Sequence, residues 1–376
     1  MILDKKDLRS LQRAIDALPE GGILKIPEGR WLTGPLHLKS SMTLELTPGA
    51  VLEFSPVMED YLPPVFTRWE GVECYNYSPL IYAQNVRDVT IRGAGKLVGN
   101  GAAWWSWKQL QQPAAERLCA AQSQGIPVEK RVFATRQDAL RPSFIQFISC
   151  QNIVLEDFTI EDGPQWTIHP VYCDHVAARR LRIRTSGPNT DGFNPDSCQN
   201  VLIEDCDFST GDDCIAINSG MNEDGWRVAR PCRQIEIRNC RFTGGHAAVA
   251  IGSGMSGGVE DVFVHDCSIQ GTERGIRLKT IPGRGGYIRN VLFQDLTICG
   301  TEQEAIEISM AYGSSTVAPL SQALPEICGI TFLRIHGKDA RCGVALKGLP
   351  DSPLRSICLE DVHVSGREPD RQEYVL

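Results

Sequence analysis

Two short motifs rich in glycine and aspartate hold the residues best suited to chemistry in this sequence. They are Asn189-Thr190-Asp191-Gly192 and Gly211-Asp212-Asp213-Cys214, so three carboxylates fall within 23 residues. Two carboxyl groups that flank a bond are what acid-catalysed glycoside hydrolysis requires, because one protonates the leaving oxygen and the other activates water. Asp-Gly and Gly-Asp are also ordinary turn sequences. The position of the motifs in the fold must therefore decide between catalysis and turn capping.

A repeated phrase places these motifs in a solenoid. An apolar residue that often follows Asn, Asp or Gln returns along most of the chain. These anchors are 23 to 39 residues apart: Ile153, Val176, Val201, Ile235, Val262, Val291, Ile330 and Ile357, with an earlier copy at Val89. Periods of roughly 20–50 residues indicate stacked repeats, and each unit consists of short alternating runs. The pattern predicts an all-β fold, a single-stranded right-handed parallel β-helix whose coils bury their apolar side chains against one another.

Two segments depart from the β pattern. Residues 6–18 have helical spacing, so we expect a short helix within an N-terminal cap at residues 1–20. Residues 105–138 are expected to form an inserted helical loop, and insertions in solenoids often lie on the binding face. No linker or change of composition divides the chain, so we expect one domain over residues 1–376.

Composition excludes several classes of partner. The formal net charge is −8 and no basic cluster is present, which argues against nucleic acid and anionic membranes as partners. Residues 1–6 lack the apolar segment of a signal peptide, and no run approaches transmembrane length, so a cytoplasmic location is expected. Fourteen cysteines are then expected to be reduced. Cys206, Cys240 and Cys267 share one repeat position, which favours an interior stack over a metal site.

Nine residues occupy roughly the same part of six successive coils when each is counted from its own anchor. They are Trp166, His169, Asp191, Asp212, Asp213, His246, Arg277, Lys279 and Tyr312. Coils stack about 4.8 Å apart, so these residues should form a stripe about 25 Å long. Carboxylates at its centre, cations to one side and an aromatic ring at each end are typical of a cleft for a sugar acid.

Four motifs in a fixed order resemble those of a known family. They are Asn189-Thr190-Asp191, Gly211-Asp212-Asp213, Gly245-His246 and Arg277-Leu278-Lys279. Together they resemble the signature motifs of the polygalacturonases of glycoside hydrolase family 28, and the resemblance runs along nearly the whole chain. Ala247 stands where that family usually has a glycine, and Leu278 where it usually has isoleucine. The run 251–259 resembles the exo-acting bacterial branch, which often has Glu at the position of Gly254.

The resemblance implies inverting hydrolysis of α-1,4-galacturonan without a metal or other cofactor. Inversion predicts carboxyl groups about 6.5–9.5 Å apart, far enough to admit a water molecule between them. The resemblance makes Asp212 the general acid and implies that Asp191 and Asp213 hold and deprotonate the attacking water. It implies that His246 forms a hydrogen bond with an aspartate. Three carboxylates in one small site do not all ionise easily, so one should keep its proton. Adjacent residues of a strand point to opposite faces, so Gly211 must permit a bulge or turn if both neighbouring aspartates enter the cleft.

The remaining residues are expected to bind substrate. Arg277 and Lys279 alternate on one strand and share a face, where they could clamp a substrate carboxylate; ordinary surface charge is the alternative. Tyr312, Trp166 and His169 are expected to form walls of subsites, although a packing role fits each nearly as well.

The sequence therefore predicts an exo-acting hydrolase of pectic oligogalacturonides. The inserted loop at 105–138 is long enough to wall off one end of the stripe, and the run 251–259 resembles the exo-acting branch. Rhamnogalacturonan and xylogalacturonan backbones remain open as substrates. A pectate lyase would need calcium and a strongly basic group, which the Asp212-Asp213 pair with His246 fits less well. A non-catalytic sugar-binding β-helix would not require all three aspartates. The oligomeric state is not indicated.

Overall fold

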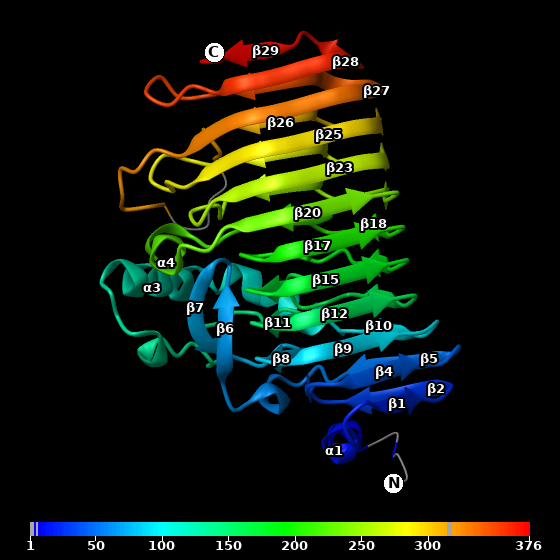
Figure 1. Cartoon of the computed structure of the whole chain (residues 1–376). Coiled ribbons are helices and arrows are strands. Elements are labelled where there is room, and N and C mark those ends of the chain that lie inside the picture. The colour runs from blue at the N-terminus through cyan, green and yellow to red at the C-terminus, as the bar shows by residue number, and fades with distance from the viewer. Residues whose placement is uncertain (1–3, 5–6, 314–317) are drawn as a thin grey trace.

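The computed structural model describes residue 4 and residues 7–313 and 318–376, which form stacked coils of parallel strands (Figure 1). The first face of the stack contains the repeat anchors. Its strands are β1 (Gly22–Ile26), β4 (Met42–Leu46), β9 (Arg87–Arg92), β12 (Gln151–Glu156), β15 (Asp174–Arg179), β17 (Gln199–Glu204), β20 (Cys232–Arg238), and the beginnings of β23 (Val259–Gln270), β25 (Tyr287–Cys299), β27 (Glu326–Lys347) and β28 (Arg355–Glu368). Every predicted anchor pairs in register with the next, from Val89 to Ile357. The fold is a right-handed parallel β-helix, as predicted.

Two further faces complete each coil. The second face contains β2 (Gly29–Thr33), β5 (Ala50–Phe54), β10 (Lys96–Val98), β13 (Thr159–Glu161), β16 (Arg182–Arg184), β18 (Asp207–Ser209) and β21 (Arg241–Phe242). The third face contains β3 (Leu36–His37), β8 (Ile81–Gln84), β11 (Ile145–Ile148), β14 (Ile168–Val171), β19 (Ile215–Ile217), β22 (Ala247–Gly252), β24 (Arg274–Lys279), β26 (Glu304–Ser309) and, after the end of β27, β29 (Arg371–Glu373). The third face is the one that positions the polar stripe.

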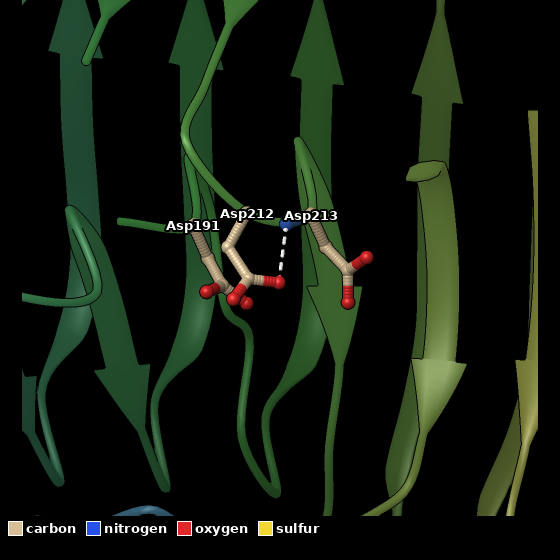
Figure 2. A group of neighbouring side chains, drawn as sticks. All are labelled: Asp191, Asp212 and Asp213. Carbon is tan, nitrogen blue, oxygen red and sulfur yellow. Dashed lines mark hydrogen bonds between the residues drawn. The ribbon is translucent and has the colours of Figure 1, made fainter. Parts of the chain in front are cut away.

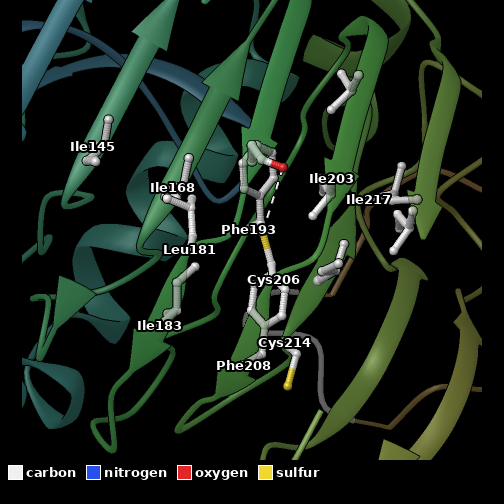
Figure 3. Packing of buried hydrophobic residues seen from close by; sticks show 14 of the residues in the cluster. Ile145, Ile168, Leu181, Ile183, Phe193, Ile203, Cys206, Phe208, Cys214 and Ile217 are labelled. Atoms are coloured by element: carbon white, nitrogen blue, oxygen red, sulfur yellow. Dashed lines mark hydrogen bonds between the residues drawn. The ribbon is translucent and has the colours of Figure 1, made fainter. Parts of the chain in front are cut away.

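The interior is filled by like side chains stacked from coil to coil. Figure 3 shows Phe208, Cys206 and Ile203 inside the stack. The rings of Phe208 and Phe242 stack with centroids 5.4 Å apart, and the backbone N–H of Cys240 donates to Sγ of Cys267 over 3.4 Å. The cysteine stack is therefore confirmed, and all fourteen cysteines are free thiols. Each fully buried apolar side chain contributes about 1.5–3 kcal/mol to folding.

Helices occupy the two segments that the sequence singled out. Helix α1 (Ser10–Ala17) lies at the N-terminal end of the stack (Figure 1) and buries Leu11 and Ile15. Residues 1–3, 5 and 6, also expected in the cap, lie outside the described residues. The insertion forms α2 (Ala102–Trp105), η2 (Ser106–Gln109), α3 (Gln112–Ser123) and η3 (Val128–Lys130). Two other short helices are η1 (Met58–Tyr61) and α4 (Asn222–Val228). No helix of the described residues is long and apolar enough to cross a membrane.

An antiparallel hairpin that sequence analysis missed lies beside the third face. It consists of β6 (Val65–Trp69) and β7 (Val72–Asn76) and stands next to α3 and α4 in Figure 1. Arg68 fixes it to the solenoid, because its Nη1 donates to Oδ1 of Asp196 over 2.9 Å and both side chains are fully buried. The turn of the hairpin, Glu70-Gly71, reaches the polar stripe.

Candidate active site

Three aspartates lie together on the third face. Asp191 precedes a bridge from Phe193 to β14 and β19, and Asp212 and Asp213 lie in the bend between β18 and β19. Figure 2 shows the three side chains side by side, and each contributes an oxygen within 4.8 Å of the others. They line a pocket together with Trp166, Asn218, Lys279, Arg284, Tyr312 and the hairpin turn.

Glycine allows the bend that brings both neighbouring aspartates into the pocket. A Cβ on Gly211 would lie 2.2 Å from the carbonyl oxygen of Gly187, so only glycine fits this close approach. The backbone N–H of Asp213 donates to Oδ1 of Asp212 over 2.9 Å, the dashed line in Figure 2. The predicted turn at Gly211 is confirmed.

The carboxylates are closer than we expected for an inverting hydrolase. Inverting enzymes usually separate their carboxyl groups by about 6.5–9.5 Å, whereas the nearest oxygens here lie within 4.8 Å. The reason is the solenoid itself: Asp191 and the Asp212-Asp213 pair lie on adjacent coils, which stack about 4.8 Å apart. The predicted separation of the carboxyl groups is therefore wrong for their nearest oxygens. Inversion therefore stays a prediction that needs a direct measurement.

His246 and Asn189 both hold Asp212. Nδ1 of His246 lies 3.1 Å from Oδ1 of Asp212, and Nδ2 of Asn189 donates to Oδ2 over 3.3 Å. The hydrogen bond to Asp212 raises the pKa of His246 although burial opposes the shift. Burial acts to raise the pKa of Asp212, but the hydrogen bond from His246 and the charge of Lys279 outweigh it and lower this pKa.

Asp191 is the carboxyl group that favours a proton in the unliganded site. It is 4% exposed, and burial followed by the charges of Asp212 and Asp213 raises its pKa well above the ordinary value. Nδ2 of Asn194 donates to its Oδ2 over 2.9 Å. One carboxyl group is thus expected to keep its proton, but this group is Asp191 and not Asp212, the general acid by resemblance. The cations beside Asp212 explain the difference.

Lys279 is paired with Asp213 at the bottom of the pocket. Its Nζ donates to Oδ2 of Asp213 over 2.6 Å. Burial acts to lower the pKa of Lys279, but the charge of Asp213 outweighs it and the pKa is raised. Gly252, the register neighbour of Lys279, has a φ of +90°. Among the described residues, no donor reaches the buried Oδ1 of Asp213.

Arg277 lies beside the pocket and is already paired. Its Nε is 2.6 Å from Oε2 of its register neighbour Glu307, although the N–H does not point at that oxygen. Its guanidinium carbon lies 5.0 Å from the ring centroid of Tyr312, and Nζ of Lys279 lies 5.2 Å from the same centroid. The two cations of the predicted clamp therefore meet at Tyr312, as their shared strand face required.

His169 does not form a wall of a subsite. Its side chain is fully buried, with Nε2 3.4 Å from Oδ2 of Asp196 and Nδ1 2.9 Å from Nε2 of Gln146. The ring of Trp166 packs edge-on against it, with centroids 4.7 Å apart, and Trp166 itself lines the pocket. The expectation for His169 is corrected because the hairpin Val65–Asn76 covers its coil: Thr67 binds the Gln146 that holds His169.

Two charged pocket residues were missed by sequence analysis. Arg284 is a fully buried cation whose Nη1 donates to Oδ1 of Asn222 over 2.7 Å. Glu70 accepts a hydrogen bond of 2.9 Å from Nε2 of Gln165. Only the glycines around Arg284, in Gly283-Arg284-Gly285-Gly286, could have drawn attention to it.

A family profile matches this chain along most of its length. The profile described as glycosyl hydrolases family 28 matches residues 24–374, nearly the whole chain. The chain belongs to this family. It is therefore a glycoside hydrolase.

Several proteins are similar to this family 28 chain. A probable polygalacturonase of Vitis vinifera is 33% identical over 92% of this chain and 67% of its own length. An exo-poly-alpha-D-galacturonosidase of Dickeya chrysanthemi is 27% identical over 81% of this chain and 54% of its own. The crystal structure of a hyperthermoactive exopolygalacturonase from Thermotoga maritima matches 98% of this chain and 86% of its own with a TM-score of 0.93 and 36% identity.

The three aspartates could in principle hold a divalent cation, since their oxygens converge. Hard cations prefer such carboxylate sets. Here, however, Nζ of Lys279 already places a positive charge 2.6 Å from Asp213, and His246 binds Asp212. The positive charge that the cluster requires is thus provided by side chains of this chain.

Asp191→Asn is expected to stabilise the protein by about 0.5–2 kcal/mol at pH 7. The pKa of Asp191 is raised by folding, so between its unfolded and folded pKa values the native state binds more protons and stability falls as pH rises. Asparagine removes that loss while Asn194 can still donate to its oxygen. Thermal unfolding should show a higher Tm at pH 7 and no difference below about pH 4. Equal Tm values at pH 7, or a lower one for the variant, would contradict the assignment; the exposed Asp205→Asn is the control.

Proposed function

We propose that this protein hydrolyses α-1,4-galacturonosidic bonds of pectic oligogalacturonides from chain ends, with inversion. The observation that carries the proposal is the pocket in which Asp191, Asp212 and Asp213 face Lys279 beside Tyr312. A galacturonate unit offers a glycosidic oxygen to the carboxyl groups and a carboxylate to the cations. The exopolygalacturonase of Thermotoga maritima, 36% identical, supports the same substrate class.

The proposed mechanism divides the carboxyl groups into an acid and a water site. Asp212 protonates the glycosidic oxygen. A bound galacturonate excludes water from Asp212 and adds a negative charge nearby, and both effects raise the pKa of a carboxyl group, so binding itself favours the acid form. Asp213 accepts a proton from the attacking water, and Asp191 orients that water. Each acid or base group contributes roughly 10²–10⁴-fold to the rate.

The hairpin turn supports exo action. Glu70-Gly71 lines the pocket that contains the aspartates, and Trp69 and Val72 beside it pack against Ala115 and Leu118 of α3. The insertion therefore packs against the hairpin and does not itself line the pocket, whereas we expected it to wall off the stripe. Resemblance of the run 251–259 to the exo-acting branch supports the same proposal. A wall across one end of a groove leaves room for a chain end only.

Viscosity measured against reducing ends on polygalacturonate tests the proposal. We expect reducing ends to rise while viscosity falls slowly, with mono- or digalacturonate as the first products. A steep early fall in viscosity with a ladder of oligomers would mean internal cleavage. Greater activity on rhamnogalacturonan or xylogalacturonan fragments would change the substrate. The cytoplasmic location stays a prediction that cell fractionation can test.

A lyase would give a different result in the same assay. Lyases leave an unsaturated product that absorbs in the ultraviolet and typically require calcium. We expect no such absorbance and no loss of activity with a chelator, because Lys279 provides the charge next to Asp213. No release of sugar from any pectic substrate would favour a binding role.

A further inference from the structure

Arg141 is a fully buried cation behind the catalytic pocket. It follows the inserted segment and reaches into two successive coils of the solenoid. Its Nη1 donates to the carbonyl oxygens of Pro164, over 3.1 Å, and Pro188, over 2.6 Å. Its Nη2 donates to Oδ1 of Asn189 over 2.8 Å. Its fourth bond, from Nε to Oε1 of Gln111 over 3.3 Å, ties it to the residue that precedes α3.

The contact with Asn189 connects Arg141 to the general acid. Because Oδ1 of Asn189 accepts from Arg141, its Nδ2 must point away from the guanidinium, and it donates to Oδ2 of Asp212 over 3.3 Å. Asn189 has a φ of +56°, a conformation that asparagine tolerates better than most residues. Arg141 thus fixes both the backbone before Asn189 and the orientation of its amide.

We propose that Arg141 is a positioning residue that holds Asp212 in its catalytic orientation through Asn189, without touching the substrate. The proposal rests on the assigned role of Asp212 in the proposed function. Its planar guanidinium suits this task, since it donates several hydrogen bonds in a fixed geometry that lysine cannot reproduce. Through Pro164 it also fixes the chain two residues before Trp166, so one side chain aligns the acid with a wall of the pocket.

Arg141 also contributes charge to the site. Its pKa is lowered to about 10 by burial, against which the charges of Glu70, Asp212 and Asp191 act, so it remains a cation at neutral pH. Asp212 is faced in addition by His246 and Lys279, and His246 also faces Glu273 at 4.0 Å; the Arg141 variants keep all three residues. Loss of one cation from this set should raise the pKa values of Asp191 and Asp212, because a nearby positive charge favours the ionised carboxylate.

The test compares Arg141→Met and Arg141→Lys with Arg131→Met. Arg131 lies in the inserted segment shortly before Arg141 and is also buried, but it pairs with Asp224 and does not line the pocket. For Arg141→Met we expect kcat on polygalacturonate to fall roughly 10²-fold, the loss typical of a misplaced catalytic group, with KM changed less than about threefold. Both limbs of the pH profile should move to higher pH. Arg141→Lys should leave both limbs of the pH profile unchanged but lose much of kcat. Lysine keeps the positive charge but lacks the planar guanidinium that donates several hydrogen bonds in a fixed geometry.

Two further measurements separate positioning from folding. If Arg141 acts through Asn189, the double variant Arg141→Met/Asn189→Ala should be no slower than Asn189→Ala alone, because coupled residues are not additive. NMR titration gives the pKa of the His246 imidazole in the free protein. This pKa reports on the interaction of His246 with Asp212 without any substrate. The pKa of His246 should rise in Arg141→Met and stay unchanged in Arg131→Met.

The outcomes decide the proposal. If the effects in the double variant were additive, Arg141 would be purely structural. The same conclusion would follow if Arg141→Met lost stability like Arg131→Met but kept the kcat and the His246 pKa of the wild type. If Arg141→Met does not fold, Arg141→Lys decides: kcat within threefold of wild type overturns the proposal. A wild-type protein inactive on galacturonan would overturn the proposed function alone, because the NMR titration would still report whether replacing Arg141 changes the Asp212–His246 pair.

Discussion

Asp212→Asn and Asp213→Asn are each expected to lower kcat on polygalacturonate by roughly 10²–10⁴-fold or more while leaving the fold intact. Asparagine keeps the size of each side chain but can neither protonate a leaving oxygen nor accept a proton from water. In Asp213→Asn the buried Lys279 also loses its anionic partner, so this variant should be the less stable of the two. Initial rates and circular dichroism measure both effects.

A matched control and the product configuration accompany these variants. Asp205→Asn replaces an exposed aspartate of the same coil and should retain full activity. NMR of the fresh product should show inverted anomeric configuration, because two carboxyl groups acting on opposite sides of the bond direct water to the opposite face of the sugar. Retention would contradict the mechanism, and activity of either variant within tenfold of wild type would contradict its role.

Lys279→Met is expected to lower kcat/KM on polygalacturonate by roughly 10²–10³-fold, the effect of removing a charge-stabilising group from a buried site. It should also destabilise the protein by about 3–5 kcal/mol, because Asp213 would remain buried without a cation. Loss on a methyl-esterified substrate should be smaller by about tenfold if Lys279 also binds the substrate carboxylate, a difference of about 1.4 kcal/mol. Rates on both substrates and thermal unfolding measure these effects.

Two variants complete this comparison. Lys347→Met changes an exposed lysine paired with Glu373 and should alter neither rate. Arg277→Met should lose activity mainly on the acidic substrate, since Glu307 rather than a catalytic aspartate is its partner. Equal losses on acidic and esterified substrates would assign both cations to structure and overturn the clamp.

Much of the fold could be predicted because a solenoid repeats one local pattern. Each anchor faces the same environment as the anchor in the coil below, so the sequence period records the stacking directly. Val201, for example, pairs with Val176 on one side and Ile235 on the other. For the same reason, residues counted from their anchors could be placed on one face, and Asp191 does meet Asp212 and Asp213 across adjacent coils.

The exact spacing of the carboxylates and the location of the proton depended on neighbours that no local pattern contains. Asp191 favours its proton because the pocket buries it beside two other carboxylates. Asp212 does not, because His246 arrives from the next coil and Lys279 from the one after that. Electrostatic effects depend on distance and burial, and both exist only after the coils stack.

The sequence by itself determined the β-helix, the family and the three aspartates, because repeats and ordered motifs are local features. The tertiary structure decided what covers the stripe. Arg68 joins the hairpin to Asp196 across 128 residues, and Arg141 joins the inserted segment to Asn189 across 48. Such contacts have no period, since each depends on one long side chain meeting one partner on another coil. They bury His169, bring Glu70 to the pocket and place a cation behind Asp212, which only the folded chain could reveal.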